Sequence, residues 1–279
     1  MEKLADNCIS DIISFTSPVD ASVFSVISKR FKTTSESDTV WNKLLPSDIQ
    51  QILSRSSSSI PVFPTKKDLY LSLSDSPILL DGGKLSFWLE KKTGKKCFMV
   101  SAQELTFTGL HHTSGFMRVP EGVVSRFTEM ASLHFNGGEL ELYGISGKVC
   151  RQMLSEETLY SCHLVMSPLS EDDVLPAVVV SRLFIDDESR EVVRERVFPV
   201  VGFGNDRGRR SDGWSEVELG TFFNVGRNIL PSVPAELQMS FSIAQFPPHF
   251  GLGTIIVQGI EFRTYDCRAP MNIVNFKRT

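Results

Sequence analysis

The chain has 279 residues, of which 41% are hydrophobic and 22% are charged, and its formal net charge is −4. This length predicts one large domain or two of ordinary size, and the small negative charge gives no electrostatic reason to expect binding to nucleic acid or to an anionic membrane. No apolar run is long enough to span a bilayer. The five cysteines are odd in number and widely scattered, which favours reduced thiols and a location in the nucleus and cytoplasm.

Short helices are expected over the first fifty residues, because apolar residues recur there at helical spacing. In the first helix these residues are Cys8, Ile9, Ile12 and Ile13. Ser17 and Asp20 form a capping box around Pro18, which predicts a second helix that continues through residues 23–31. Two further helical patterns cover residues 40–45 and 47–53, and the second of these starts at the cap-like Ser47.

Serines and prolines dominate residues 54–64, which predicts a linker or an exposed connection. Thr65 and Asp68 then form a second capping box and begin one more helix. Beyond Pro77 the pattern changes to alternating, β-rich runs. The predicted strands are 85–90, 96–101, 104–108, 132–135, 140–145, 161–166, 177–185, 194–201, 214–219, 237–243 and 254–263. No helical crossover long enough for parallel strands separates them, so we predict an antiparallel sandwich or jelly roll.

Catalytic and metal-binding motifs are not apparent in the sequence. The five histidines have no zinc-ligand spacing, and no G-x-S-x-G elbow is present. The stretch "GISGKV" at 144–149 lacks the spacing of a phosphate loop, and Gly144 is interpreted as a β-bulge. We therefore expect a protein that is not an enzyme and that uses neither a metal nor another cofactor.

The N-terminal helices resemble an F-box over about forty residues. The resemblance rests on Leu4, on the apolar positions of residues 8–13, on Pro18, on "ISKRF" at 27–31 and on Trp41. Ala5 departs from the motif, which usually has proline there. The resemblance implies docking on a Skp1-type adaptor and, through it, on a cullin-RING ubiquitin ligase. The residues that it assigns to this contact are Leu4, Cys8, Ile9, Ile12, Pro18, Ile27, Lys29, Phe31 and Trp41.

Residues from about 66 to 263 resemble the plant phloem protein 2 family, whose founding members are lectins related to tobacco agglutinin. The stretches that carry the resemblance are "KKDLYLSL", "DGGKLSFWLEKKTGKKCFMVSAQELT", "SRFTEMASL", "LELYGISGKV", "DGWSEVELGTFF" and "IIVQGIEFR". Together the two parts resemble the F-box phloem protein 2-B group of flowering plants. This implies a jelly-roll sandwich that selects a protein or glycoprotein for ubiquitination. The expected division is an F-box at 1–47, a connecting helix and linker at 48–65, the sandwich at 66–267 and a tail at 268–279.

Each part also has an alternative interpretation. The apolar residues of the helices could simply form a small core, although a unit of forty residues is too small to bury all of them, and exposed apolar patches usually mark a partner surface. In the sandwich, tryptophans of the lectin relatives are replaced at Gly109 and in "FMRV" at 116–119, which leaves Phe116 and Arg118 as candidate contacts. Trp88 and Trp214 lie within strands, where burial is expected. The target of the sandwich is thus either an N-glycan or a protein surface, and a lectin acting without a ubiquitin ligase is the alternative function.

Overall fold

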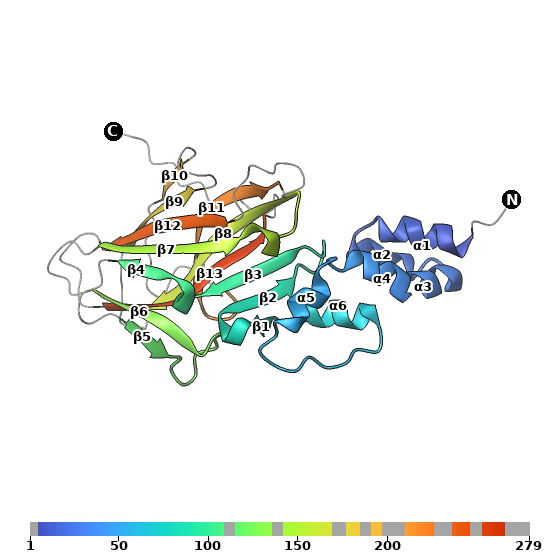
Figure 1. Ribbon diagram of the computed structural model, residues 1–279, viewed down its shortest axis with the longest axis horizontal. Coiled ribbons are helices and arrows are strands. Elements are labelled where there is room, and N and C mark those ends of the chain that lie inside the picture. Colours follow the sequence, from blue (N-terminus) through green and yellow to red (C-terminus); the bar gives the residue numbers. More distant parts are fainter. Residues whose placement is uncertain are drawn as a thin grey trace.

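The structure is a computed structural model that describes residues 5–108, 115–135, 142–168, 177–184, 191–196, 210–225, 236–245 and 253–265. Helices gather at the N-terminal end, and antiparallel sheets make up the rest of the described chain (Figure 1). The predicted fold class, a small all-α unit followed by a mainly β sandwich, is therefore confirmed.

Six α-helices precede the sheets in the described residues. They are α1 (Asp6–Ser14), α2 (Pro18–Phe24), α3 (Lys29–Ser35), α4 (Asp38–Leu44), α5 (Ile49–Ser54) and α6 (Lys66–Asp75). Both predicted capping boxes are confirmed. The backbone N–H of Asp20 donates to Ser17 Oγ at 3.1 Å, and that of Asp68 donates to Thr65 Oγ1 at 3.1 Å. These side chains satisfy N–H groups that have no partner inside their helices.

The single helix predicted from Pro18 to Phe31 is wrong, because the chain forms two helices there. It leaves α2 after Phe24, and Ser28 then caps α3 by accepting a hydrogen bond from the backbone N–H of Phe31. Residues 25–28 form the turn between them. The prediction that Ser47 caps the next helix is also wrong, since α5 begins after Asp48 without a side-chain cap.

Two sheets form the sandwich, and all of their described strand pairs are antiparallel. The first sheet contains β1 (Ile78–Leu80), β2 (Leu85–Leu89), β3 (Lys96–Ser101), β5 (Gly115–Arg118), β6 (Glu129–Phe135), β8 (Thr158–Pro168), β11 (Ser215–Asn224) and β13 (Gly253–Thr264). The second contains β4 (Thr106–Thr108), β7 (Leu142–Cys150), β9 (Ala177–Phe184), β10 (Glu191–Arg196) and β12 (Glu236–Gln245). Strand β13 is central, because it pairs with β8 along one side and with β3 and β6 along the other. The short strands β1 and β5 were not predicted.

The main core contains inward-facing residues of both sheets, among them Phe98, Tyr160 and Phe262. A second, smaller cluster lies on the opposite face of the first sheet, because neighbouring residues of a strand point to opposite faces. Its buried members are Met99, Phe127, Met130, Val165, Trp214 and Ile256. The first sheet is therefore covered on both faces.

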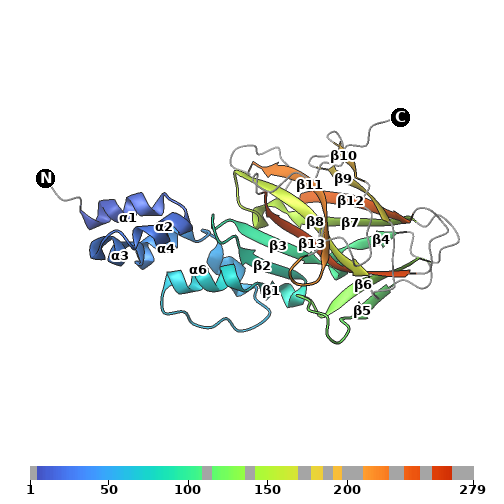
Figure 2. The same cartoon turned by 180° about the vertical axis from the view of Figure 1, so that it is seen from behind.

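The helices at 49–75 connect the N-terminal unit to the sandwich through a continuous core. Figures 1 and 2 show α5 and α6 between helices α1–α4 and strands β1–β3. The rings of Trp41 in α4 and Tyr70 in α6 lie 5.1 Å apart, and both residues belong to the same buried cluster as the sandwich core. The Tyr70 hydroxyl lies 3.2 Å from the carbonyl oxygen of Glu90, beyond β2.

Polar contacts reinforce the same junction. Lys96 of β3 is almost fully buried, and its Nζ donates to Asp48 Oδ2 at 2.8 Å and to the carbonyl oxygen of Gln152 at 2.9 Å. Arg55 forms a two-contact ion pair with Asp81, which lowers the pKa of that carboxyl. The predicted linker thus begins as a structured segment, and serines 57–59 are exposed beyond it.

Candidate functional site

The N-terminal helices carry the largest concentration of exposed apolar side chains in the described chain. Six of the eleven large hydrophobic residues that are exposed lie within residues 12–27. They are Ile12, Phe15, Val19, Val23, Val26 and Ile27, and we call them the helical face. Phe15 is 87% exposed and Val26 is 82% exposed, so each presents nearly its whole side chain. Exposure of this kind is costly in water unless a partner covers it.

Predicted contact residues fall into two groups. Cys8, Ile12, Ile27 and Lys29 are exposed, and Phe31 is half-buried against Phe24. Ile9, Pro18 and Trp41 are buried, so they support the helical face from inside and do not form part of its surface. Leu4 lies outside the described residues.

The interior of the helical unit is built around the buried side chain of Trp41. Trp41 is 1% exposed, and its indole N–H donates to the backbone carbonyl of Ser35 at 2.7 Å. A buried indole needs such an acceptor, because an unpaired N–H would oppose folding. Lys43 lies near the exposed end of Phe15, 5.9 Å from the ring centroid, and forms an ion pair with Asp11. The surface thus has an apolar centre with charges beside it, which is the usual composition of a protein interface.

In the sandwich, neither described tryptophan offers a free aromatic face. Trp214 is buried, and its indole N–H donates to the carbonyl oxygen of Val124 at 2.6 Å. Trp88 is half-buried, and the guanidinium of Arg126 lies 4.3 Å from its ring centroid. Burial within a strand was expected for both residues. Trp214 is buried but lies one residue before β11, whereas Trp88 lies in β2 and is only half-buried. A sugar ring therefore has no accessible tryptophan to stack on in this part of the chain.

Phe116 and Arg118 lie on one face of β5, at an edge of the sandwich. Phe116 is 53% exposed, and its ring makes an edge contact with Phe107 of β4 at 6.0 Å between centroids. Arg118 is exposed and stands opposite Glu129 of β6, whose carboxylate receives a hydrogen bond from Gln103. The alternate residue, Met117, packs on the second hydrophobic cluster and holds β5 in place. We call Phe107, Phe116 and Arg118 the edge corner.

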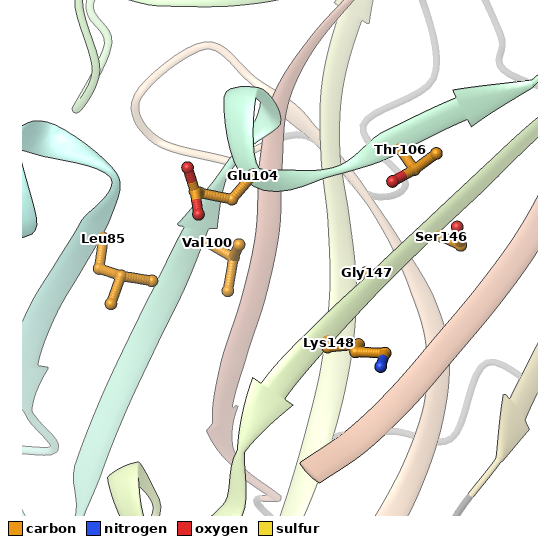
Figure 3. A pocket seen from close by; sticks show the side chains of 7 residues that line it. All are labelled: Leu85, Val100, Glu104, Thr106, Ser146, Gly147 and Lys148. Atoms are coloured by element: carbon orange, nitrogen blue, oxygen red, sulfur yellow. The ribbon is translucent and has the colours of Figure 1, made fainter.

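A cleft of about 330 Å³ opens between the two sheets (Figure 3). It is lined by Leu85, Val100, Glu104, Thr106, Ser146, Gly147 and Lys148. Glu104 forms an ion pair with Lys84 at 2.8 Å. Ser146, Gly147 and Lys148 belong to β7, so the stretch that was compared with a phosphate loop is a regular strand.

Charged residues on the outer face of the first sheet pair with one another. Glu261 is buried and accepts a hydrogen bond from Arg210 at 2.9 Å, while Arg263 binds Glu216 through both of its terminal nitrogens. Burial raises the pKa of Glu216, but the hydrogen bonds from Arg263 outweigh this effect and lower it overall. This network ties the 210–214 turn to the sheet, which is a structural role.

Metal-ligating side chains do not gather at one place among the described residues. No cluster of three or more histidine, cysteine, aspartate or glutamate residues suitable for a metal ion occurs among them. Burial raises the pKa of the Cys97 thiol to about 12, which makes it unreactive. No helix in the described part of the chain is long and apolar enough to cross a membrane. His111, His112, His249 and Cys267 lie outside the described residues.

Comparison with known proteins places these features in a family. The sequence pattern of the phloem protein 2 (PP2) family matches residues 95–264. F-box protein At2g02240 of Arabidopsis thaliana is 36% identical over 275 residues, which cover 93% of this chain and 79% of that protein. The chain belongs to the plant F-box proteins of the PP2-B group. F-box protein PP2-B10 of the same plant is 34% identical, with coverage of 94% of this chain and 93% of the relative.

Solved structures similar to this PP2-B group protein are carbohydrate-binding modules. One, from a study of the promiscuous specificity of modules of the β-sandwich superfamily, has a TM-score of 0.35 and 11% identity, and covers 62% of this chain and 76% of its own. A module specific for non-crystalline cellulose has a TM-score of 0.34 and 12% identity, and the match covers 57% of this chain and 87% of the module. These values describe a general likeness between β-sandwiches.

Sequence reasoning missed part of the helical face of this F-box protein. Phe15, Val19, Val23 and Val26 were not among the predicted contact residues. Phe15 follows Ile12 at a spacing of three, which places two residues on the same side of a helix. This spacing could have identified Phe15 from the sequence. Val26 was hidden by the wrong prediction of one continuous helix.

Proposed function

We propose that this protein is the non-catalytic substrate-recognition subunit of a Skp1-cullin-F-box type ubiquitin ligase. In this role the helical face binds a Skp1-type adaptor, and the sandwich selects the target. The observation that carries the proposal is that the helical unit has a buried interior around Trp41 and yet leaves six large apolar side chains exposed within residues 12–27. Membership of the PP2-B group of F-box proteins supports the same partner.

The arrangement fits a helical adaptor interface in physical terms. A few apolar anchors carry most of the binding energy in such interfaces, and truncating one of them costs about 2 kcal/mol or more. Phe15 and Val26 are the most exposed members of the helical face, so they gain the most from being covered. Ile9 and Pro18 hold the backbone beneath them and are expected to matter for stability.

The test is binding of the full chain to a purified plant Skp1-type protein by titration calorimetry. The double variant Phe15→Ser, Val26→Ser should bind at least 100-fold more weakly, since two lost anchors amount to about 3–4 kcal/mol. Val62→Ser is the matched control, because Val62 is 98% exposed but lies in the 54–64 connection. Its affinity should equal that of the natural chain. Unchanged binding by the double variant would contradict the assignment of the helical face.

The sandwich is proposed to select a protein target through its edge corner. Phe116 is an exposed aromatic residue on the same face of β5 as Arg118, which forms no ion pair with another described residue, whereas Trp88 and Trp214 are covered. The alternative, an N-glycan bound in place of a protein, is addressed by the experiment on the edge corner described next.

A further inference from the structure

Several edges of the two sheets are protected against pairing with another chain. Residues 55–57 cover β1, since Ser56 bridges to Leu80 and the backbone N–H of Ser57 donates to the carbonyl oxygen of Leu79. Strand β11 has a register shift and two glutamates, Glu216 and Glu218. Four of the six residues of β10 are charged, namely Glu191, Arg194, Glu195 and Arg196. Covered ends, bulges and charges are the usual means of blocking unwanted strand addition.

Strand β5 has neither a covering segment nor a bulge among the described residues. It pairs with β6 in a regular register, contains no proline and has Arg118 as its single charged residue. No described strand pairs with its other side. It is thus the edge of the first sheet that is most open to an added strand.

The register of β5 shows which backbone groups face this open side. The backbone N–H of Val119 donates to the carbonyl oxygen of Thr128, which continues the ladder between β5 and β6. In an antiparallel pair, alternate residues direct their N–H and C=O groups toward the partner strand. Met117 and Gly115 therefore bond to β6, while the N–H and C=O groups of Phe116 and Arg118 point outward.

The same two residues supply side chains that can distinguish between added strands. Phe116 is 53% exposed and offers an aromatic surface that Phe107 partly covers. Arg118 is exposed and has no ion-pair partner among the described residues, because the opposite carboxylate of Glu129 is held by Gln103. An extended peptide beside β5 would place one residue next to Phe116 and another, two positions away, next to Arg118.

We propose that β5 binds its target by strand addition, and that the preferred segment carries an apolar residue and an acidic residue two positions apart. This inference rests on the proposed function, because it defines the kind of target that the sandwich selects. Main-chain hydrogen bonds would supply affinity, and the contacts with Phe116 and Arg118 would supply selectivity.

The experiment uses a fully randomised heptapeptide phage library against the immobilised full chain. We expect the enriched peptides to contain an apolar and an acidic residue two positions apart. The affinity of the best of them is then measured by fluorescence anisotropy. Arg118→Pro removes the outward N–H and should weaken binding at least tenfold, whereas Arg118→Ala keeps that N–H and should weaken it about threefold. A copy of the peptide N-methylated at alternate residues should not bind.

One further variant and one control keep the result unambiguous. Arg118→Glu should reverse the preference from acidic to basic peptides without affecting the backbone, even if Arg118→Pro folds poorly. Adaptor binding by each variant should stay unchanged. Failure of adaptor binding in the natural chain, with peptide binding intact, would overturn the ligase role and leave strand addition standing.

The inference would be overturned by a library that yields no peptide sensitive to both Arg118→Pro and Arg118→Glu. It would also be overturned if a high-mannose N-glycan or a chitin oligosaccharide, tested on the same surface, bound in a Phe116-dependent manner while peptides did not.

Discussion

The helical unit and the sandwich treat their apolar residues in opposite ways. The sandwich buries them on both faces of its first sheet. Among its described residues, the exposed large hydrophobic ones are Phe116, Val124 and the cross-strand pair of Leu159 and Phe223. The helical unit buries a small interior and leaves six large side chains exposed within sixteen residues. A small unit has too little volume to cover its own apolar surface. The difference agrees with the proposed binding of a partner by the helical face, and it leaves the edge corner as the candidate contact of the sandwich.

The largest expected effect comes from removing the indole at the centre of the helical unit. Trp41→Ala should lower the free energy of unfolding by about 3–5 kcal/mol, because a fully buried aromatic side chain leaves a cavity. Trp88→Ala is the matched change in the sandwich and should cost less, since Trp88 is half-buried. Urea denaturation of both variants measures the difference. Equal losses would show that Trp41 contributes no more to the free energy of unfolding than the half-buried Trp88 does.

The next largest effect is expected at the junction of the two regions. Lys96→Met removes the ammonium group that binds Asp48 and Gln152, and it should destabilise the protein by about 1–2 kcal/mol. Lys91→Met is the control, because Lys91 forms an ion pair with Asp75 on an exposed surface. Its stability in urea should match that of the natural chain. A similar loss in both variants would contradict a special role for the buried contact.

The charged outer face of the sandwich should make its stability depend on acid pH. In the folded protein the pKa of Glu216 lies below its ordinary value. The carboxylate therefore stabilises the fold fully at pH values above the ordinary pKa, and this stabilisation is lost as the pH falls through the lower pKa of the folded state. Thermal melting between pH 7 and pH 3 should therefore show a decline at the acid end. Glu216→Gln should melt about 3 °C lower at pH 7 and decline less steeply. Parallel curves for the two proteins would rule out this origin of the acid sensitivity.

The smallest expected effect concerns the start of α2. Ser17→Ala removes the hydrogen bond to the backbone N–H of Asp20 and should cost about 1 kcal/mol. Ser14→Ala, at the end of α1, is the control and should be nearly neutral. Both are measured by thermal melting, and an effect on adaptor binding beyond this loss of stability is not expected.

Much of the fold was predictable because local signals and the final structure agree. Capping boxes at Ser17 and Thr65, and the alternating pattern of the sheets, depend on short-range chemistry. Gly144 shows the limit of such reasoning. It was interpreted as a bulge, but it pairs regularly with Ser242, and a Cβ atom there would lie 2.4 Å from Thr108 Oγ1. The close approach of a distant strand, which the sequence does not display, explains the glycine.

The candidate sites, too, were predictable only where they depend on short-range patterns. Ile12 was recognised from helical spacing, and Ile27 from the F-box resemblance, although Ile27 lies in the turn between α2 and α3. Burial of Ile9 and Trp41 depends on how four helices pack. At the edge corner, Phe116 and Arg118 were identified from the sequence as candidate contacts. The contact between Phe116 and Phe107 was not predicted, because it joins strands of different sheets.

The continuous core through α6 has a consequence for attempts to rebuild the protein from parts. A chimera that joins these helices to another recognition unit just before Thr65 would separate Trp41 from Tyr70 and expose both rings. The same cut would remove the hydrogen bond between Asp38 and the backbone N–H of Lys66. A transplant that carries residues 5–75 together with β1–β3 keeps these contacts. The functional halves of the molecule therefore do not coincide with its exchangeable pieces.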